Sequence, residues 1–233
     1  MPLVSDTTSQ ESLAAAASIV RSKEGYVSVL IACAGISGPV TYGIFPSLSS
    51  PDKPSISEVQ AKLWNVPIQD FTQTLHVNVS GIFYTVVAFL DLLAAANEKF
   101  PAPNPKSQVI TVSSGAAFVR SEQPMPYAVS KAGAVHMTKQ LSTTFAPYKI
   151  RFNCICPGWY PSEMTQEAPF IKNPVDPTVE GAISAEVSPL ERTGSAEDIN
   201  GLILFMTSRA GGYLSGSVQL TDGGTVSTIP SSY

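Results

Sequence analysis

Charged residues and metal-binding side chains are scarce in this chain of 233 residues. Only 14% of the residues are charged, the formal net charge at pH 7 is −4, and lysine and arginine form no cluster. Because proteins that bind nucleic acids use such clusters to neutralise phosphates, we expect no nucleic-acid partner. The two histidines and three cysteines lack the spacing of a zinc site or a disulfide framework, so we expect no metal centre.

The sequence also offers little that suggests a leader peptide or a membrane span. Residues 1–6 contain neither a basic region nor a long apolar run. The longest apolar helix candidate, residues 82–96, is interrupted by Asp91 and is shorter than the roughly 20 residues that cross a bilayer. We therefore expect a cytoplasmic protein with no membrane partner.

What the chain does contain is enough apolar material for one compact domain, since 44% of its residues are hydrophobic. Helical patterns cover residues 9–23, 68–96, 126–145 and 196–207, and strand patterns cover residues 27–32, 108–112, 150–154 and 217–220. Such alternation is typical of an α/β fold with a doubly wound parallel sheet of the Rossmann-like type. We expect residues 1–233 to form a single domain.

One predicted strand delivers a serine to the edge of the sheet where ligands usually bind. Residues 109–112 form a β-branched run that is followed by Ser113 and Ser114. This pattern predicts a buried parallel strand with Ser114 at its carboxyl end. Tyr127 and Lys131 follow in the next helical pattern, and a spacing of four residues places their side chains on one face of a helix.

Serine, tyrosine and lysine together suit the reduction of a carbonyl group. Hydride addition creates an alkoxide, which needs hydrogen-bond donors and a proton, and Ser114 and Tyr127 can supply both. A free tyrosine has a pKa of about 10, and a nearby ammonium such as that of Lys131 would lower it. Taken alone, the pair could equally be an ordinary helical tyrosine and a surface lysine.

The order and spacing of these segments resemble the classical short-chain dehydrogenase/reductase family. Ser114, Tyr127 and Lys131 stand where that family has its catalytic residues, and Asn78, in the run His-Val-Asn-Val-Ser-Gly, matches its catalytic asparagine. The resemblance implies that Lys131 also holds the nicotinamide ribose. It further implies that Asn78 anchors a water molecule that links Lys131 to solvent.

A nicotinamide cofactor follows from the same resemblance, with NADP favoured over NAD. Asp6 stands where family members contact adenine, and Ser162 stands where a threonine commonly contacts the carboxamide or a phosphate. The residues that would contact the cofactor are Asp6, Ala34, Gly35, Tyr127, Lys131, Pro157, Gly158 and Ser162.

The sequence departs from the family pattern in two places. Ala32 and Cys33 replace the two asparagines that usually precede the Ala-Gly turn, and the first glycine of the chain is Gly25. The family's Gly-x-x-x-Gly-x-Gly turn, which receives the pyrophosphate, is therefore not seen. If residues 3–6 are the tail of the third strand, about two βα units, on the order of 60 residues, are missing. We expect an amino-terminally truncated domain that binds the cofactor weakly.

Two further expectations concern substrate and assembly. Residues 163–189 contain several prolines and occupy the place of the family's substrate lid, where Phe170, Ile171 and Val175 either line an apolar pocket or pack as core. The preceding run, residues 157–165, resembles a fungal branch linked to 3-oxoacyl reduction and rhamnolipid synthesis. A homodimer or homotetramer is expected through the two longest helical patterns, by way of Phe83, Val87, Leu90, Ala94, Ala134, Val135, Thr138 and Leu141.

The favoured function is therefore hydride transfer between a nicotinamide cofactor and a small-molecule carbonyl or secondary alcohol. Two alternatives stay open at this point. One is a non-redox pseudoenzyme or interaction module, which the absent glycine-rich turn would favour. The other is a cofactor-free lyase or isomerase that uses Ser114 and Tyr127 on the substrate alone.

Overall fold

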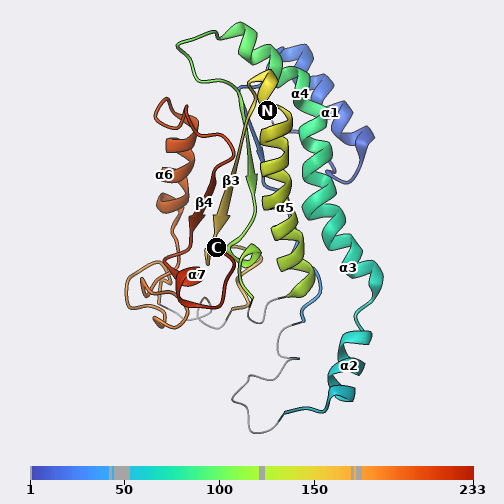
Figure 1. The fold of residues 1–233 in the computed structure, drawn as a ribbon, viewed down its shortest axis with the longest axis vertical. Helices are drawn as coiled ribbons and strands as arrows, with labels where there is room; N and C mark the ends of the chain where they lie inside the picture. The colour runs from blue at the N-terminus through green and yellow to red at the C-terminus, as the bar shows by residue number, and fades with distance from the viewer. Residues whose placement is uncertain (1, 42–43, 45–52, 121–123, 169–170, 172–174) are drawn as a thin grey trace.

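A computed structural model of the chain describes residues 2–41, 44, 53–120, 124–168, 171 and 175–233 (Figure 1). Its centre is a parallel sheet of four strands in the order β1-β2-β3-β4. The strands are β1 (Val29–Ala32), β2 (Gln108–Val112), β3 (Arg151–Pro157) and β4 (Val218–Thr221). The predicted α/β fold with a parallel sheet is confirmed, and β3 runs three residues beyond its predicted end.

Two long helices cover one face of the sheet, as the right half of Figure 1 shows. They are α4 (Ile82–Lys99) and α5 (Met125–Thr144). The core beneath them consists of Val86, Leu93, Val109, Leu141, Ile150 and Phe152. Helix α1 (Gln10–Lys23) is capped by Ser9, whose side chain accepts from the Ser12 amide. It packs on the outer side of α4 with Leu13 and Ala17 buried, and Arg21 forms an exposed ion pair with Asp91.

The opposite face is covered by α6 (Ala196–Thr207), at the left of Figure 1. Met206 of this helix is buried together with Ile110 of β2 and Ile155 of β3. Because successive strand residues point to opposite faces, β2 and β3 are buried on both sides, so even their polar residues are buried and hydrogen-bonded. These polar residues are Gln108, Thr111, Arg151 and Asn153. On β1, the edge strand, Ile31 of this face is 41% exposed.

The helix predicted over residues 68–96 is present and ends three residues later, at Lys99. Helix α3 (Ile68–Leu75), a π-helical turn η1 (His76–Gly81) and α4 form one continuous helix of 32 residues. The expectation that this helix is too short to cross a bilayer is therefore wrong. By length and composition it could do so, but the core helix of a globular domain passes the same test, and Val86 and Leu93 are buried against the sheet.

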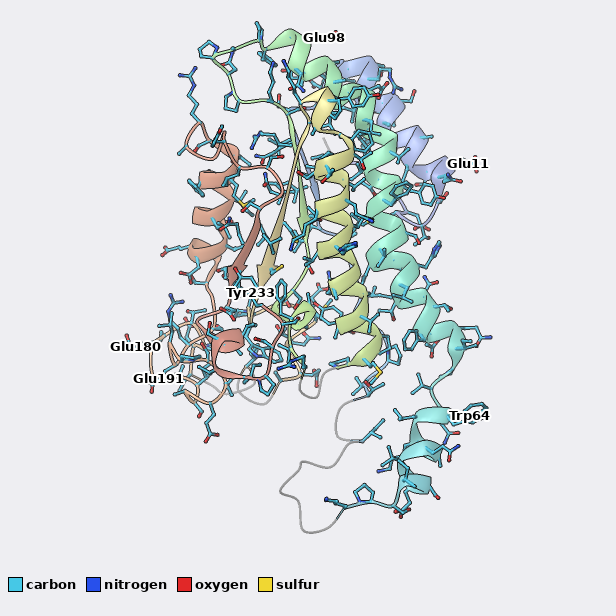
Figure 2. The ribbon with its side chains drawn as sticks, in the orientation of Figure 1. Glu11, Trp64, Glu98, Glu180, Glu191 and Tyr233 are labelled. Atoms are coloured by element: carbon cyan, nitrogen blue, oxygen red, sulfur yellow. The ribbon has the colours of Figure 1, made fainter. Side chains whose placement is uncertain are left out.

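Other departures from expectation are local. Helix α2 (Ile56–Trp64) was not predicted, although Ser55 and Glu58 form a capping box at its start. In Figure 2 the whole helix lies away from the sheet, with Trp64 labelled at the end that leads to α3. Residues 3–6 form no strand, so the expected third-strand tail is wrong. Instead, the Asp6 amide donates to Ser12 in the first turn of α1. The remaining elements are the short helices η2 (Gly115–Ala117), η3 (Ala146–Tyr148) and α7 (Thr225–Thr228).

Candidate active site

Ser114 lies at the carboxyl end of β2, as the sequence predicts. The ladder continues one residue beyond the strand, because the Ser113 amide donates to Ile155 O at 2.8 Å. Ser114 then begins η2, and its Oγ accepts a hydrogen bond from the Ala116 amide at 3.1 Å. The side chain of Ser113 turns inward and donates to the backbone oxygen of Lys131 at 2.7 Å. These contacts join the serine segment to α5.

Tyr127 and Lys131 lie one turn apart near the start of α5. Pro126 in the first turn supplies a helical φ without needing a hydrogen-bond partner for its nitrogen, which favours a helix start here. The Lys131 ammonium lies 5.6 Å from the centre of the Tyr127 ring. Lys131 is only 3% exposed, and its Nζ donates to Val112 O at 3.1 Å. The predicted convergence of Ser114, Tyr127 and Lys131 is therefore present in the fold.

The electrostatics of the pair differ from the expectation. Burial is the largest influence on Tyr127 and raises the pKa of its phenol, an interaction with the Ser114 hydroxyl lowers it, and Cys156 raises it further. Burial likewise lowers the pKa of Lys131, against a smaller opposing effect of the cysteines. Lys131 is not among the influences that set this pKa, so the expected lowering by Lys131 is not seen; its ammonium lies over the ring at 5.6 Å from the ring centre and donates to Val112 O.

Asn78 is fully buried in the π-helical turn η1 and makes three hydrogen bonds. Its Oδ1 accepts from the Ile36 amide at 2.8 Å, and its Nδ2 donates to Ile36 O at 2.8 Å and to Ser130 Oγ at 2.9 Å. Asn78 therefore joins the turn after β1 to α5, next to Lys131. This structural role was not predicted, and the water-binding role implied by the resemblance stays a prediction.

Gly35 lies against both Lys131 and Asn78. A β-carbon at Gly35 would be 3.1 Å from Lys131 Nζ and 3.2 Å from Asn78 Oδ1. The turn thus leaves room for the ammonium because it carries no side chain at this position. Of its neighbours, Ala34 is exposed, and Cys33 is an exposed free thiol at the end of β1.

Pro157 and Gly158 reach the same region from the end of β3. The Gly158 amide donates to Thr221 O at 2.9 Å, and a β-carbon at Gly158 would lie 2.6 Å from the Asp222 α-carbon. Since that separation is shorter than real β-carbons show, the approach of the two chains requires glycine. On the other side, a β-carbon at Gly115 would lie 3.5 Å from Pro157 O. The predicted Pro-Gly turn therefore lies beside the segment that carries Ser114.

Two predicted cofactor-binding residues make only local contacts. Asp6 is exposed and accepts hydrogen bonds from the Thr8 amide and hydroxyl, which lower its pKa. Ser162 is exposed and hydrogen-bonds to Thr165 within its own turn. Within the described ranges, no hydrogen bond joins either residue to Tyr127 or Lys131.

The cysteines of β3 lie underneath the site. Cys154 and Cys156 are fully buried, their sulfurs are 3.8 Å apart, and they pack with Val135, which confirms the predicted core role. Their shared hydrogen bond lowers the pKa of Cys154 to about 7 and raises that of Cys156. Period-two alternation places the two thiols on one face, but the sequence could not show that this face lies beneath Tyr127.

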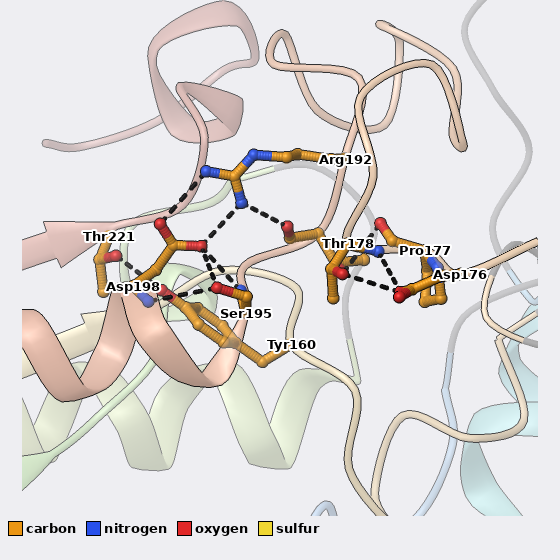
Figure 3. A network of polar contacts seen from close by, with 9 residues as sticks. Tyr160, Asp176, Pro177, Thr178, Arg192, Ser195, Asp198 and Thr221 are labelled. Carbon is orange, nitrogen blue, oxygen red and sulfur yellow. Dashed lines mark hydrogen bonds and ion pairs between the residues drawn. The ribbon is translucent and has the colours of Figure 1, made fainter.

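The expected lid segment is held at its two ends by a polar network (Figure 3). At the first end, the Tyr160 hydroxyl hydrogen-bonds to Thr221 at 2.7 Å, and the ring fills the space where a β-carbon of Gly194 would lie. At the second end, Arg192 forms an ion pair with Asp198, whose carboxylate also caps α6 with Ser195. Of the expected apolar trio, Ile171 is half-buried, Val175 is exposed, and Phe170 lies outside the described residues.

The site residues fit a nicotinamide cofactor on the side of Lys131. Among the residues that the structure describes, Val112 is the only acceptor for the Lys131 ammonium, which therefore has two further protons to donate and lies against the turn at Gly35. Burying an ammonium costs free energy unless polar groups accept hydrogen bonds from all of its N–H groups. Ribose hydroxyls are suitable partners, and the glycine leaves space for them.

Comparison with known proteins agrees with this geometry. A family model described as Enoyl-(Acyl carrier protein) reductase matches residues 1–226. The short-chain dehydrogenase/reductase PhomF of Diaporthe leptostromiformis is 41% identical over 233 residues, which cover 100% of this chain and 76% of that protein. The short-chain dehydrogenase/reductase SAT3 of Stachybotrys chartarum is 36% identical over 247 residues and covers 100% of this chain and 88% of its own length.

Solved structures show the same fold. RhlG of Pseudomonas aeruginosa, in a complex with NADP, has a TM-score of 0.73 at 24% identity and covers 96% of this chain and 76% of its own. Levodione reductase has a TM-score of 0.73 at 20% identity, and the match covers 97% of this chain and 77% of its own. The chain belongs to the short-chain dehydrogenase/reductase family and is an oxidoreductase that uses a nicotinamide cofactor.

Proposed function

We propose that this chain transfers a hydride between NADP and a carbonyl or secondary-alcohol group, with Tyr127, Ser114 and Lys131 as catalytic residues. The observation that carries the proposal is the position of Tyr127. Its phenol interacts with Ser114 at the end of β2, and it shares one helix face with the buried ammonium of Lys131. Nothing in the fold or in the relatives favours the non-redox alternatives.

Each side chain has a distinct role in the proposal. When bound, the cofactor supplies or accepts the hydride. Tyr127 donates the proton of its phenol to the substrate oxygen in the reductive direction and takes it back in the oxidative direction. Ser114 donates a hydrogen bond to the same oxygen as negative charge develops there.

Lys131 and Asn78 act at the cofactor side. Lys131 has two ammonium protons left for the nicotinamide ribose, because its one described acceptor is Val112. Asn78 holds the turn that contains Gly35 against this ammonium through its pair of bonds with Ile36. We keep the proton-relay water at Asn78 as part of the proposal.

For the cofactor itself, we propose NADP over NAD, with support from the NADP complex of RhlG, a protein of the same fold. The contacts proposed from this chain are Ala34, Gly35, Tyr127, Lys131, Pro157 and Gly158 near the nicotinamide, with Ser162 and Asp6 further out. Measuring kcat/KM with NADPH and with NADH, against a panel of ketones, tests the proposal. Reduction with neither cofactor would contradict it.

For assembly, we propose a single family domain over residues 1–233 that forms a homodimer or homotetramer in the cytoplasm. The apolar side chains proposed for the interface need revision on α5, since Ala134, Val135, Thr138 and Leu141 are buried in the core of this chain. The exposed large apolar side chains that remain are Phe83, Tyr84 and Val87 on α4 and Met125 and Val129 on α5. Light scattering measures the oligomeric state, and cell fractionation measures the location.

A further inference from the structure

The segment that follows β4 runs alongside the segment that carries Ser114. After Gly224 the chain forms α7 (Thr225–Thr228), and Val226 of this helix is only 2% exposed. A β-carbon at Gly115 would lie 3.4 Å from the Val226 methyl group, so the two segments are in contact directly after the serine.

Backbone hydrogen bonds continue this contact. Val119 and Ser231 form an antiparallel bridge, in which the Arg120 amide donates to Pro230 O and the Ser232 amide donates to Phe118 O, both at 2.8 Å. The two segments are more than 100 positions apart in the sequence, as the 114-residue separation of Phe118 and Ser232 shows.

An aromatic pair closes the contact. The rings of Phe118 and Tyr233 meet edge to face, with their centres 4.8 Å apart at an angle of 68° (Figure 2, where Tyr233 is labelled). Phe118 in turn packs on the buried cluster of Val135, Cys154 and Cys156 beneath the site. Phe118 is therefore packed between Tyr233 on its outer side and the buried cluster on its inner side.

The serine segment has little to hold it in place by itself. Helix η2 is three residues long, and its own backbone contributes only the bonds from Ala117 to Ser114 O and from Phe118 to Gly115 O. Short 3-10 turns have poor hydrogen-bond geometry and depend on their surroundings. The bonds of Ser113 hold the start of this segment to β3 and α5. The contacts made by Val226, Ser232 and Tyr233 hold its other side, from Gly115 to Phe118.

We propose that residues 226–233 are a brace that positions Ser114 for the reaction, with Tyr233 and the Ser232 amide as positioning groups. The inference rests on the proposed function, because it assumes that Ser114 contacts the substrate oxygen. Neither group touches the reacting atoms. They act by keeping Phe118, and with it Ser114, at a fixed distance from Tyr127.

Two pairs of matched variants test the brace. Tyr233→Ala removes the ring, whereas Tyr233→Phe keeps the edge-to-face contact. Ser232→Pro removes the amide that donates to Phe118 O, whereas Ser232→Ala keeps it. Because a shift of about 1 Å at a reacting group can cost up to about 100-fold in rate, we expect kcat to fall at least about tenfold in the first member of each pair. KM for NADPH should stay near the wild-type value in all four variants. In the second member of each pair, kcat should also stay near the wild-type value.

Two further measurements distinguish positioning from general stability. Amide hydrogen exchange at residues 116–118 should become faster in Tyr233→Ala while exchange in β2 and α5 is unchanged. The pH profile of kcat should also move to higher pH, because Ser114 no longer lowers the Tyr127 pKa while Lys131 and Cys156 stay in place. Tyr213→Ala, at a fully exposed ring, is the control and should change none of these values.

The results separate the brace from the proposed function. If Tyr127→Phe abolishes turnover but Tyr233→Ala and Ser232→Pro keep wild-type kcat and wild-type exchange at residues 116–118, the brace is overturned and the function stands. If Tyr127→Phe keeps full turnover, the proposed function fails, and the exchange data alone then decide whether residues 226–233 hold the serine segment.

Discussion

Gly35 and Lys131 face each other at the centre of the site, and a β-carbon on the glycine would lie 3.1 Å from the lysine ammonium. The same imaginary carbon would lie 3.2 Å from Asn78 Oδ1, so one missing side chain accommodates two proposed catalytic residues. The turn between them is fixed by the paired hydrogen bonds of Asn78 with Ile36. Cofactor binding should therefore be sensitive to a single methyl group at Gly35.

The substitution Gly35→Ala should weaken NADPH binding. The added methyl group presses on Lys131 Nζ, and overpacking of this kind costs roughly 1–3 kcal/mol, which corresponds to a rise of about 5- to 150-fold in the dissociation constant. Calorimetric titration measures the change. Gly201→Ala in α6, where a β-carbon meets nothing within 4 Å, is the matched control and should bind NADPH as the wild type does. Equal affinities in the two variants would show that the turn does not contact the cofactor.

A second glycine substitution should act on stability. In Gly158→Ala the new carbon would lie 2.6 Å from the Asp222 α-carbon, and backbone cannot move aside as a flexible side chain can. We expect a loss of about 1–3 kcal/mol in the free energy of unfolding, measured in urea. Gly201→Ala should instead gain about 0.5–1 kcal/mol, because alanine favours the helix. An unchanged midpoint for Gly158→Ala would mean that β3 and the Asp222 turn are not so closely packed.

The order of thiol reactivity follows from burial. Cys33 is exposed, whereas Cys154 and Cys156 are fully buried behind Tyr127 and Lys131. Alkylation of the native protein, followed by peptide mass spectrometry, should label Cys33 first and the other two only under denaturing conditions. The lowered pKa of Cys154 does not offset its burial, because the reagent must reach the sulfur. Labelling of all three cysteines at one rate would contradict the position of the pair.

The ion pair at the start of α6 should make stability depend on pH in the acid range. Arg192 and the Ser195 amide hold the pKa of Asp198 well below its ordinary value. The stabilisation is therefore fully present above the unfolded pKa of about 3.9 and is lost as the pH falls below it. Because both side chains are about one-third exposed, Asp198→Ala should cost only about 1–2 kcal/mol at pH 7, most of it from the lost cap.

Urea unfolding at pH 7 and pH 3 measures this difference. The gap between wild type and Asp198→Ala should be smaller at pH 3, because the carboxyl group of the unfolded chain is then mostly protonated while that of the folded chain is still ionised. Glu197→Ala, one residue earlier in the same turn, should cost less at pH 7, since Glu197 makes no contact comparable to the capping box. A gap that widens at pH 3 would contradict the assigned sign.

The residues that sequence reasoning placed well are those with strong local patterns. The β-branched run of β2 predicted where Ser114 lies, and the four-residue spacing of Tyr127 and Lys131 predicted their shared face. Helix α2 was missed although the capping box of Ser55 and Glu58 is visible in the sequence, so its start could have been found.

Other features leave no local signal. A π-helical turn adds one residue within a helix without a distinctive composition, so the exact placement of Asn78 could not be predicted. The bridge between Val119 and Ser231 joins a short segment from the middle of the chain to one at its carboxyl end, and only the fold brings them together. The direction of the Tyr127 pKa shift depends on burial and on where Lys131 donates, which are properties of packing.

The most direct test of the account is the turnover of Tyr127→Phe with NADPH and the best substrate of the wild type. The variant keeps the ring and its packing but loses the phenolic proton, so kcat should fall by about 10²- to 10⁴-fold while NADPH binding changes far less. Tyr213→Phe, at a fully exposed position, is the control and should keep wild-type turnover. Near-full turnover by Tyr127→Phe would contradict the account.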